Sequence, residues 1–204
     1  MRRRAGPVAV WRPGHGYSFI EIVFVAGLVA TLSAFALPAV QRTLDDFRTV
    51  GATRYLAARL ERVRIEALTR SADVALRFVQ DGLTYRYGVY IDGNANGVRA
   101  ADIANGIDRL ISHEERLVDQ FAGVDLGVLP ALPGLDPSSA PPGIDPVRLG
   151  SGNTATFTPE GTATPGSLYI LGPRSVQLVI RIVGETGRTR IFKFDSRSRM
   201  WKPL

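Results

Sequence analysis

The strongest constraint in this sequence is an apolar run close to the N-terminus. From Phe19 to Val40, 22 residues carry only one charge, that of Glu21. At about 1.5 Å per residue, a helix of this length spans roughly 33 Å, enough to cross the hydrocarbon core of a bilayer. Residues 1–16 contain four arginines and no acid, and positive charge before such a helix keeps the N-terminus cytoplasmic. We therefore expect one membrane-spanning helix, with the rest of the chain emerging on the far side.

The formal net charge of +6 is distributed unevenly along the chain. Residues 1–16 carry +4, residues 17–173 carry −4 and residues 174–204 carry +6. The first block fits a topology signal, and the last is a candidate surface patch.

The residue inventory argues against catalysis. The 204 residues include no Cys and only two His, His15 and His113, which excludes disulfides, thiolate metal sites and a cysteine nucleophile. His113 lies in a charged stretch, and no G-x-S-x-G, P-loop or H-E-x-x-H motif occurs. We expect a protein that is not an enzyme and has no cofactor.

A processing signal precedes the apolar run, whereas a secretory signal has its cleavage site behind it. The leader ends in Gly16, and Tyr17 and then Glu21 follow before the uninterrupted apolar stretch. This order resembles the class III signal of type IV pilins and pseudopilins, although Tyr17 replaces the usual Phe and Ser18-Phe19 the usual Thr-Leu.

The resemblance implies roles for three residues. A prepilin peptidase would cut between Gly16 and Tyr17, methylate Tyr17 as the new N-terminus, and leave the helix in place. Glu21, fifth after the cut, would pair with the N-terminal amine of a neighbouring subunit and set the assembly register. The alternative for Glu21 is a carboxylate that reaches the interface of a plain signal anchor.

Local patterns predict the rest of the fold. Leu56, Leu60, Val63 and Ala67 form one apolar stripe of a helix that continues to Arg70. Alternating residues on either side of Asp81-Gly82 predict a β-hairpin from Val74 to Tyr90. We expect a leader (1–16), a membrane and assembly helix (17–40) and a periplasmic domain (41–204). The domain comprises an amphipathic helix (41–70), a β-rich part (74–204) and a Pro-rich surface loop (130–146).

The segment 92–102 has two interpretations. Asp92, Asn94 and Asn96 place oxygen ligands at alternate positions before Gly97, as in the first half of an EF-hand-like calcium loop. The twelfth position is Ile103 rather than an acid, so calcium binding would be weak, and the alternative is a structural Asx-turn loop.

The last third predicts strands at 154–158, 167–171, 176–183 and 188–194. The run Phe157-Thr158-Pro159-Glu160-Gly161, a strand ending in Gly172, and Gly187-Arg188-Thr189-Arg190 together resemble the C-terminal pattern of the GspH/FimT group of pseudopilins. The resemblance implies a pilin-like α+β fold, with a long N-terminal helix packed on an antiparallel β-sheet.

The resemblance implies one of two functions, because the group contains two kinds of protein. Minor pseudopilins of type II protein secretion assemble into a periplasmic pseudopilus with other pseudopilins on an inner-membrane platform. The alternative is a FimT-like minor pilin, which binds DNA during natural transformation; Arg188 and Arg190 would then contact phosphates. The paired arginines could instead be structural, and either cap the hairpin or pair with Asp195 or Glu185. We expect the secretion role, in a single-pass inner-membrane protein. A plain anchored periplasmic domain would require that no processing occurs.

Overall fold

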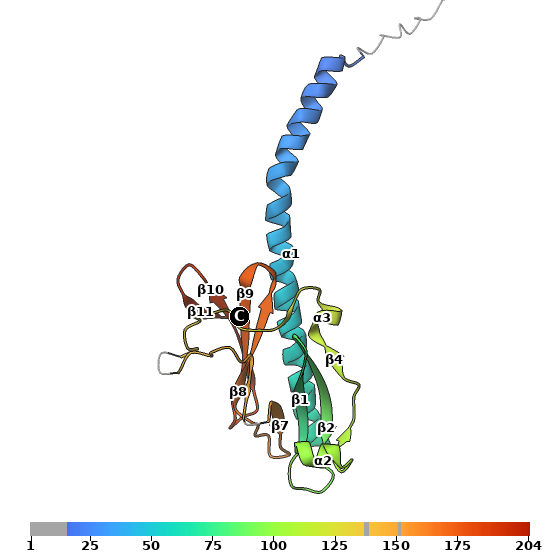
Figure 1. Ribbon diagram of the computed structural model, residues 1–204, viewed down its shortest axis with the longest axis vertical. Coiled ribbons are helices and arrows are strands. Elements are labelled where there is room, and N and C mark those ends of the chain that lie inside the picture. The colour runs from blue at the N-terminus through green and yellow to red at the C-terminus, as the bar shows by residue number, and fades with distance from the viewer. Residues whose placement is uncertain (1–15, 137–138, 151) are drawn as a thin grey trace, which may run out of the picture. The chain divides into compact units, whose positions relative to one another are not determined.

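The computed structural model describes residues 16–136, 139–150 and 152–204 (Figure 1). The chain divides into two compact units, residues 1–41 and 42–204. Helix α1 (Phe19–Arg70) belongs to both. In the first unit the large apolar side chains of α1 are exposed wherever the structure describes them, and the helix is long and apolar enough to cross a membrane.

The second unit holds the remainder of α1 and two antiparallel sheets, which confirms the predicted α+β fold class but divides the strands between two sheets rather than one. The first sheet has the order β3-β2-β1-β7, with β4 also pairing β2. Its strands are β1 (Val74–Asp81), β2 (Thr84–Ile91), β3 (Arg109–Leu110), β4 (Glu115–Arg116) and β7 (Thr154–Phe157).

The second sheet has the order β11-β10-β9-β8-β5, with β6 also pairing β8. Its strands are β5 (Asp125–Leu126), β6 (Val147–Leu149), β8 (Gly166–Gly172), β9 (Val176–Ile182), β10 (Thr189–Asp195) and β11 (Met200–Pro203). Two short helices, α2 (Ala100–Ala104) and α3 (Leu117–Gln120), and a 3-10 turn (Pro173–Ser175) complete the unit.

The core lies between α1 and the inner faces of both sheets. The four stripe residues of α1 are essentially fully buried, as predicted, and they belong to one apolar cluster with residues of β1, β2, β8 and β9. Burial of each large apolar side chain contributes about 1.5–3 kcal/mol. This packing fixes the sheets on the helix.

The β-hairpin is confirmed with a shifted turn. Asp81 pairs with Thr84, so the two-residue turn is Gly82-Leu83 rather than the expected Asp81-Gly82. Tyr85, Tyr87 and Val89 are buried on one face of β2, as the alternation predicts.

The Pro-rich loop forms no helix or strand over its described residues, but part of it is buried. Leu132 packs with Tyr169 and Val179 on the outer face of the second sheet, and Leu135 packs against this cluster. The loop therefore covers one sheet face instead of lying wholly on the surface.

Candidate functional site

The residues around the expected cleavage position lie at the start of α1. Gly16 and Tyr17 are exposed and precede the helix, and residues 1–15 of the leader lie outside the described part of the chain. The Ser18 carbonyl accepts the N–H groups of Glu21 and Ile22 at 3.0 and 3.1 Å, which forms the first helical turn. A side chain added at Gly16 would meet no atom within 4 Å, so the fold itself does not require this glycine.

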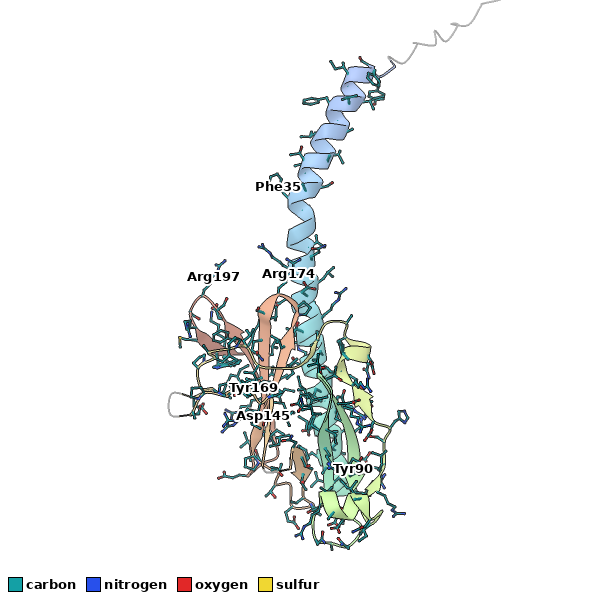
Figure 2. The ribbon with its side chains drawn as sticks, viewed as in Figure 1. Phe35, Tyr90, Asp145, Tyr169, Arg174 and Arg197 are labelled. Atoms are coloured by element: carbon teal, nitrogen blue, oxygen red, sulfur yellow. The ribbon has the colours of Figure 1, made fainter. Side chains whose placement is uncertain are left out.

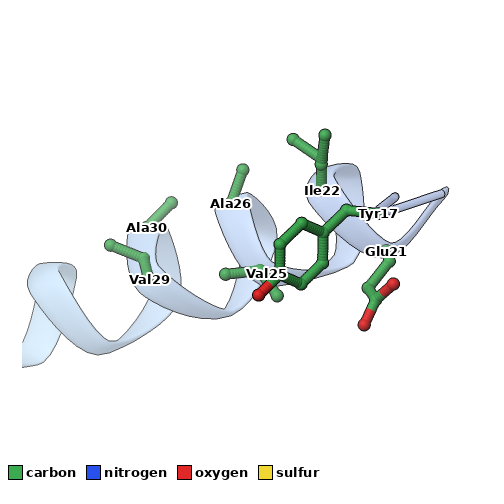
Figure 3. A pocket seen from close by; sticks show the side chains of 7 residues that line it. All are labelled: Tyr17, Glu21, Ile22, Val25, Ala26, Val29 and Ala30. Carbon is green, nitrogen blue, oxygen red and sulfur yellow. The ribbon is translucent and has the colours of Figure 1, made fainter. Parts of the chain in front are cut away.

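Glu21 stands on an otherwise apolar helix face. Figure 3 shows its carboxylate pointing away from the helix. Glu21 lines a hollow together with apolar side chains and one tyrosine, namely Tyr17, Ile22, Val25, Ala26, Val29 and Ala30. A carboxylate in the first turn is favoured by the helix dipole, because the unpaired N–H groups there carry partial positive charge. In a bilayer such a group still needs a cationic partner.

Two of the segments that carry the family resemblance, 157–161 and 187–190, lie close together in the structure. Gly187 has φ +61°, and a Cβ there would lie 2.9 Å from the Gly161 carbonyl oxygen and 3.2 Å from the Arg64 side chain on α1. At the other end of β8, a Cβ on Gly172 would lie 1.9 Å from Thr49 Oγ1. Glycine is therefore needed at 172 and 187 because backbone and helix approach too closely for a side chain.

Arg188 and Arg190 are both exposed, one in the turn after Gly187 and one in β10. The Val183 N–H donates to the Arg188 carbonyl, which continues the β9–β10 pairing by one residue pair. Arg188 and Arg190 therefore face the same side of the sheet.

The strand register extends this side into an arginine row, defined here as Arg148, Arg181 and Arg190. Arg190 lies opposite Arg181, Arg181 opposite Ser167, and Ser167 opposite Arg148. The sequence alone does not indicate Arg148 and Arg181, because only the register across four strands brings them together.

The arginine row has no acidic partner among the described residues. Arg181 donates to Ser167 Oγ at 3.4 Å, and Arg148 to the Pro141 carbonyl at 3.3 Å. Burial raises the pKa of Tyr169, although the neighbouring Arg148 and Arg181 oppose this shift. Among the described residues, neither Arg188 nor Arg190 pairs with Asp195 or Glu185, and Asp195 pairs with Lys202 instead.

The segment around Asp92 forms a loop held by its own backbone. Asp92 Oδ1 accepts the N–H groups of Asn94 and Ala95, and Oδ2 that of Gly97, at 2.7–3.0 Å. Burial alone would raise the pKa of Asp92, but these amide hydrogen bonds outweigh it and lower the pKa.

Asp108 closes the same loop from the other side. Its carboxylate accepts the N–H groups of Gly93 and Arg99 at 3.1 and 2.8 Å. Across the described ranges, no group of three or more His, Asp or Glu side chains could hold a metal ion. The geometry is that of a carboxylate-closed loop, and weak calcium binding by Asp92, Asn94 and Asn96 stays the untested alternative to the structural interpretation of this segment.

A long N-terminal helix, apolar in its first part and packed on antiparallel sheets in its second, defines the pilin-like class of α+β proteins. Residues 52–186 match the family model described as type II transport protein GspH, and the chain belongs to this family. It is thus a pseudopilin of the type II secretion class, a structural component that interacts with other pseudopilins. No curated protein and no solved structure matches the chain.

Proposed function

We propose that the chain is a minor pseudopilin of a type II secretion system, anchored in the inner membrane with its second unit in the periplasm. The observation that carries this proposal is the exposed apolar part of α1, which starts three residues after Gly16 and carries Glu21 as its only charge up to Val40. Exposed apolar surface of this extent needs lipid or neighbouring helices around it.

Processing and assembly follow as two steps. Prepilin peptidase cuts after Gly16 and methylates the Tyr17 amine, and the helix stays in the membrane. The Glu21 carboxylate then pairs with the N-terminal amine of a neighbouring subunit as the inner-membrane platform adds the chain to the pseudopilus. Pairing offsets the cost of keeping an ionised carboxylate in an apolar environment.

Three variants test these steps in cells that contain the peptidase, the platform and the other pseudopilins. Gly16→Ala is expected to retain the leader, seen as an unshifted band. Glu21→Ala is expected to be processed but absent from sheared pseudopili, and the control Ser18→Ala to be processed and incorporated. Normal cleavage of Gly16→Ala contradicts the processing step, and incorporation of Glu21→Ala contradicts the pairing step.

The arginine row favours a second candidate function, binding to a nucleic-acid backbone. Like charges directly opposite on neighbouring strands destabilise a sheet, and a phosphate between Arg181 and Arg190 would relieve that repulsion. Arg188 would add a cation on the same side.

Duplex DNA binding by the full chain in detergent tests this candidate at two salt concentrations. We expect Arg188→Gln/Arg190→Gln to weaken binding and reduce its salt dependence. The control Arg62→Gln/Arg109→Gln removes the same charge from exposed positions elsewhere. Equal affinity of both double variants contradicts a nucleic-acid role for Arg188 and Arg190.

A further inference from the structure

The second unit carries a cluster of cations at the end where its part of α1 begins. Arg174 Nε lies 3.0 Å from Asp45 Oδ2, and Lys193 Nζ pairs with Asp46. These two ion pairs hold the 173–175 turn and β10 against the first turn of α1 in this unit. Figure 2 shows Arg174 and Arg197 at this same end, opposite the end that carries α2 in Figure 1.

We name this cluster the basic end. Counted over the residues that form these ion pairs or are exposed beside them, it holds seven cations and three acids. The cations are Arg42, Arg48, Arg174, Lys193, Arg197, Arg199 and Lys202, and the acids are Asp45, Asp46 and Asp195.

All three acids of the basic end are already engaged within the cluster. Asp45 faces Arg48 at 3.6 Å in addition to Arg174, Asp46 holds Lys193, and Asp195 holds Lys202. Arg42 and Arg197 are exposed, and neither forms an ion pair with any described residue. The basic end therefore has surplus positive charge directed at solvent.

Chain length keeps Arg42, where the basic end starts, close to the bilayer surface. Arg42 follows the last residue of the apolar run, Val40, by two positions, so at most about 7 Å of chain separates them. Asp45 and Asp46 come three and four helical residues after Arg42, about 6 Å further along the helix. Arg174 and Lys193, which pair with Asp45 and Asp46, thus lie within about one to two Debye lengths of the headgroups when the apolar run of α1 spans a membrane.

We propose that the basic end docks on anionic phospholipid headgroups of the membrane that α1 crosses, before the subunit enters a filament. This proposal rests on the membrane anchoring proposed above. Headgroup phosphates are the nearest anions that the chain geometry provides, and Arg or Lys near an anionic bilayer is attracted electrostatically. Arg188 and Arg190 are separate from this surface, because they lie at the opposite end of β10 from Lys193 and Asp195.

The absence of cysteine makes site-specific labelling direct. Ser196 is exposed in the β10–β11 turn of the basic end, and Ala101 is exposed in α2 at the other end. The full chain would carry a fluorophore at Ser196→Cys or at the control Ala101→Cys. Each chain is placed in nanodiscs of phosphatidylcholine alone or with one quarter phosphatidylglycerol, with a quencher on a fraction of the headgroups.

We expect stronger quenching at position 196 in the anionic discs, reversed by 0.5 M salt, and no composition effect at position 101. Each cation near the surface shifts the docked-to-free ratio about fivefold. Arg42→Gln/Arg197→Gln should therefore lower that ratio about 25-fold, whereas the charge-matched control Arg62→Gln/Arg109→Gln should leave it unchanged.

Three distinguishable results would contradict the membrane anchoring, the docking on anionic lipid, or the choice of lipid over nucleic acid. A chain that does not enter nanodiscs contradicts the anchoring itself. A chain that enters but shows equal quenching in both lipid compositions contradicts only the docking. Binding of duplex DNA that depends on Arg42 and Arg197, without lipid-dependent quenching, would assign the basic end to nucleic acid instead.

Discussion

A partly buried charge network pins the β4–α3 segment to α1. Arg59 Nη2 lies 2.7 Å from Glu115 Oε1, and the Tyr55 hydroxyl donates to Glu115 Oε2 at 2.6 Å. Gln120 donates to the same carboxylate oxygen at 3.1 Å. Glu115→Gln would therefore remove the counter-charge of Arg59, whose Nε already lacks a hydrogen-bond partner.

The cost of this substitution follows from burial. Removing one partner of a fully buried pair costs about 3–5 kcal/mol, because the other charge stays buried alone. The side chains of Arg59 and Glu115 keep 13% and 17% exposure. Solvent screening at this exposure reduces the expected loss in unfolding free energy to about 2–3 kcal/mol.

Glu66→Gln is the matched control. Glu66 pairs with Arg70 at 3.1 Å on the surface of the same helix, with side-chain exposures of 33% and 51%. Its loss should cost less than about 0.5 kcal/mol.

Urea unfolding of the full chain in detergent would measure both changes. Trp201 serves as the fluorescence reporter because it packs against Tyr169 and Phe194 at centroid distances of 6.1 and 5.3 Å. Equal destabilisation by Glu115→Gln and Glu66→Gln would refute the argument that burial makes the Glu115 network important.

Further predictions concern the core, the loop and one glycine. Leu60→Ala should cost about 2–5 kcal/mol in urea unfolding, against under about 1 kcal/mol for the half-exposed Leu68→Ala; similar costs would contradict the packing of the stripe. The folded structure lowers the pKa of Asp92 below its ordinary 3.8. The ionised Asp92 carboxylate therefore stabilises the folded state above pH 3.8, and this stabilisation is lost as the pH falls through the lowered pKa. Asp92→Asn should therefore flatten the acid limb of a stability–pH curve, and an unchanged limb argues against this role. Gly187→Ala should lower the melting temperature, because its Cβ would meet the Gly161 carbonyl; an unchanged value contradicts the close approach.

Elements set by local periodicity could be predicted from the sequence. The stripe of Leu56 and Leu60 and the hairpin around Asp81 depend on residues a few positions apart, where one spacing decides which face is buried. The strand β11 was not predicted, because Met200–Pro203 is short, ends in proline and forms only as a partner of β10.

The contacts that depend on residues distant in the sequence could not be predicted. Glu115 meets Tyr55 and Arg59 across about sixty residues of chain, and Arg148 joins Arg190 only through the register of the strands between them. By contrast, the roles predicted for Gly16, Tyr17 and Glu21 depend only on residue types and spacing within one short stretch of sequence.

The central claim is that the chain is a processed pseudopilin, and the mass of its mature N-terminus tests this most directly. The full chain would be coexpressed with a prepilin peptidase, purified from membranes and measured by intact mass spectrometry and N-terminal peptide sequencing. We predict loss of residues 1–16 and a methylated amine on Tyr17. A chain that keeps its leader, or one cut behind Val40, would contradict it.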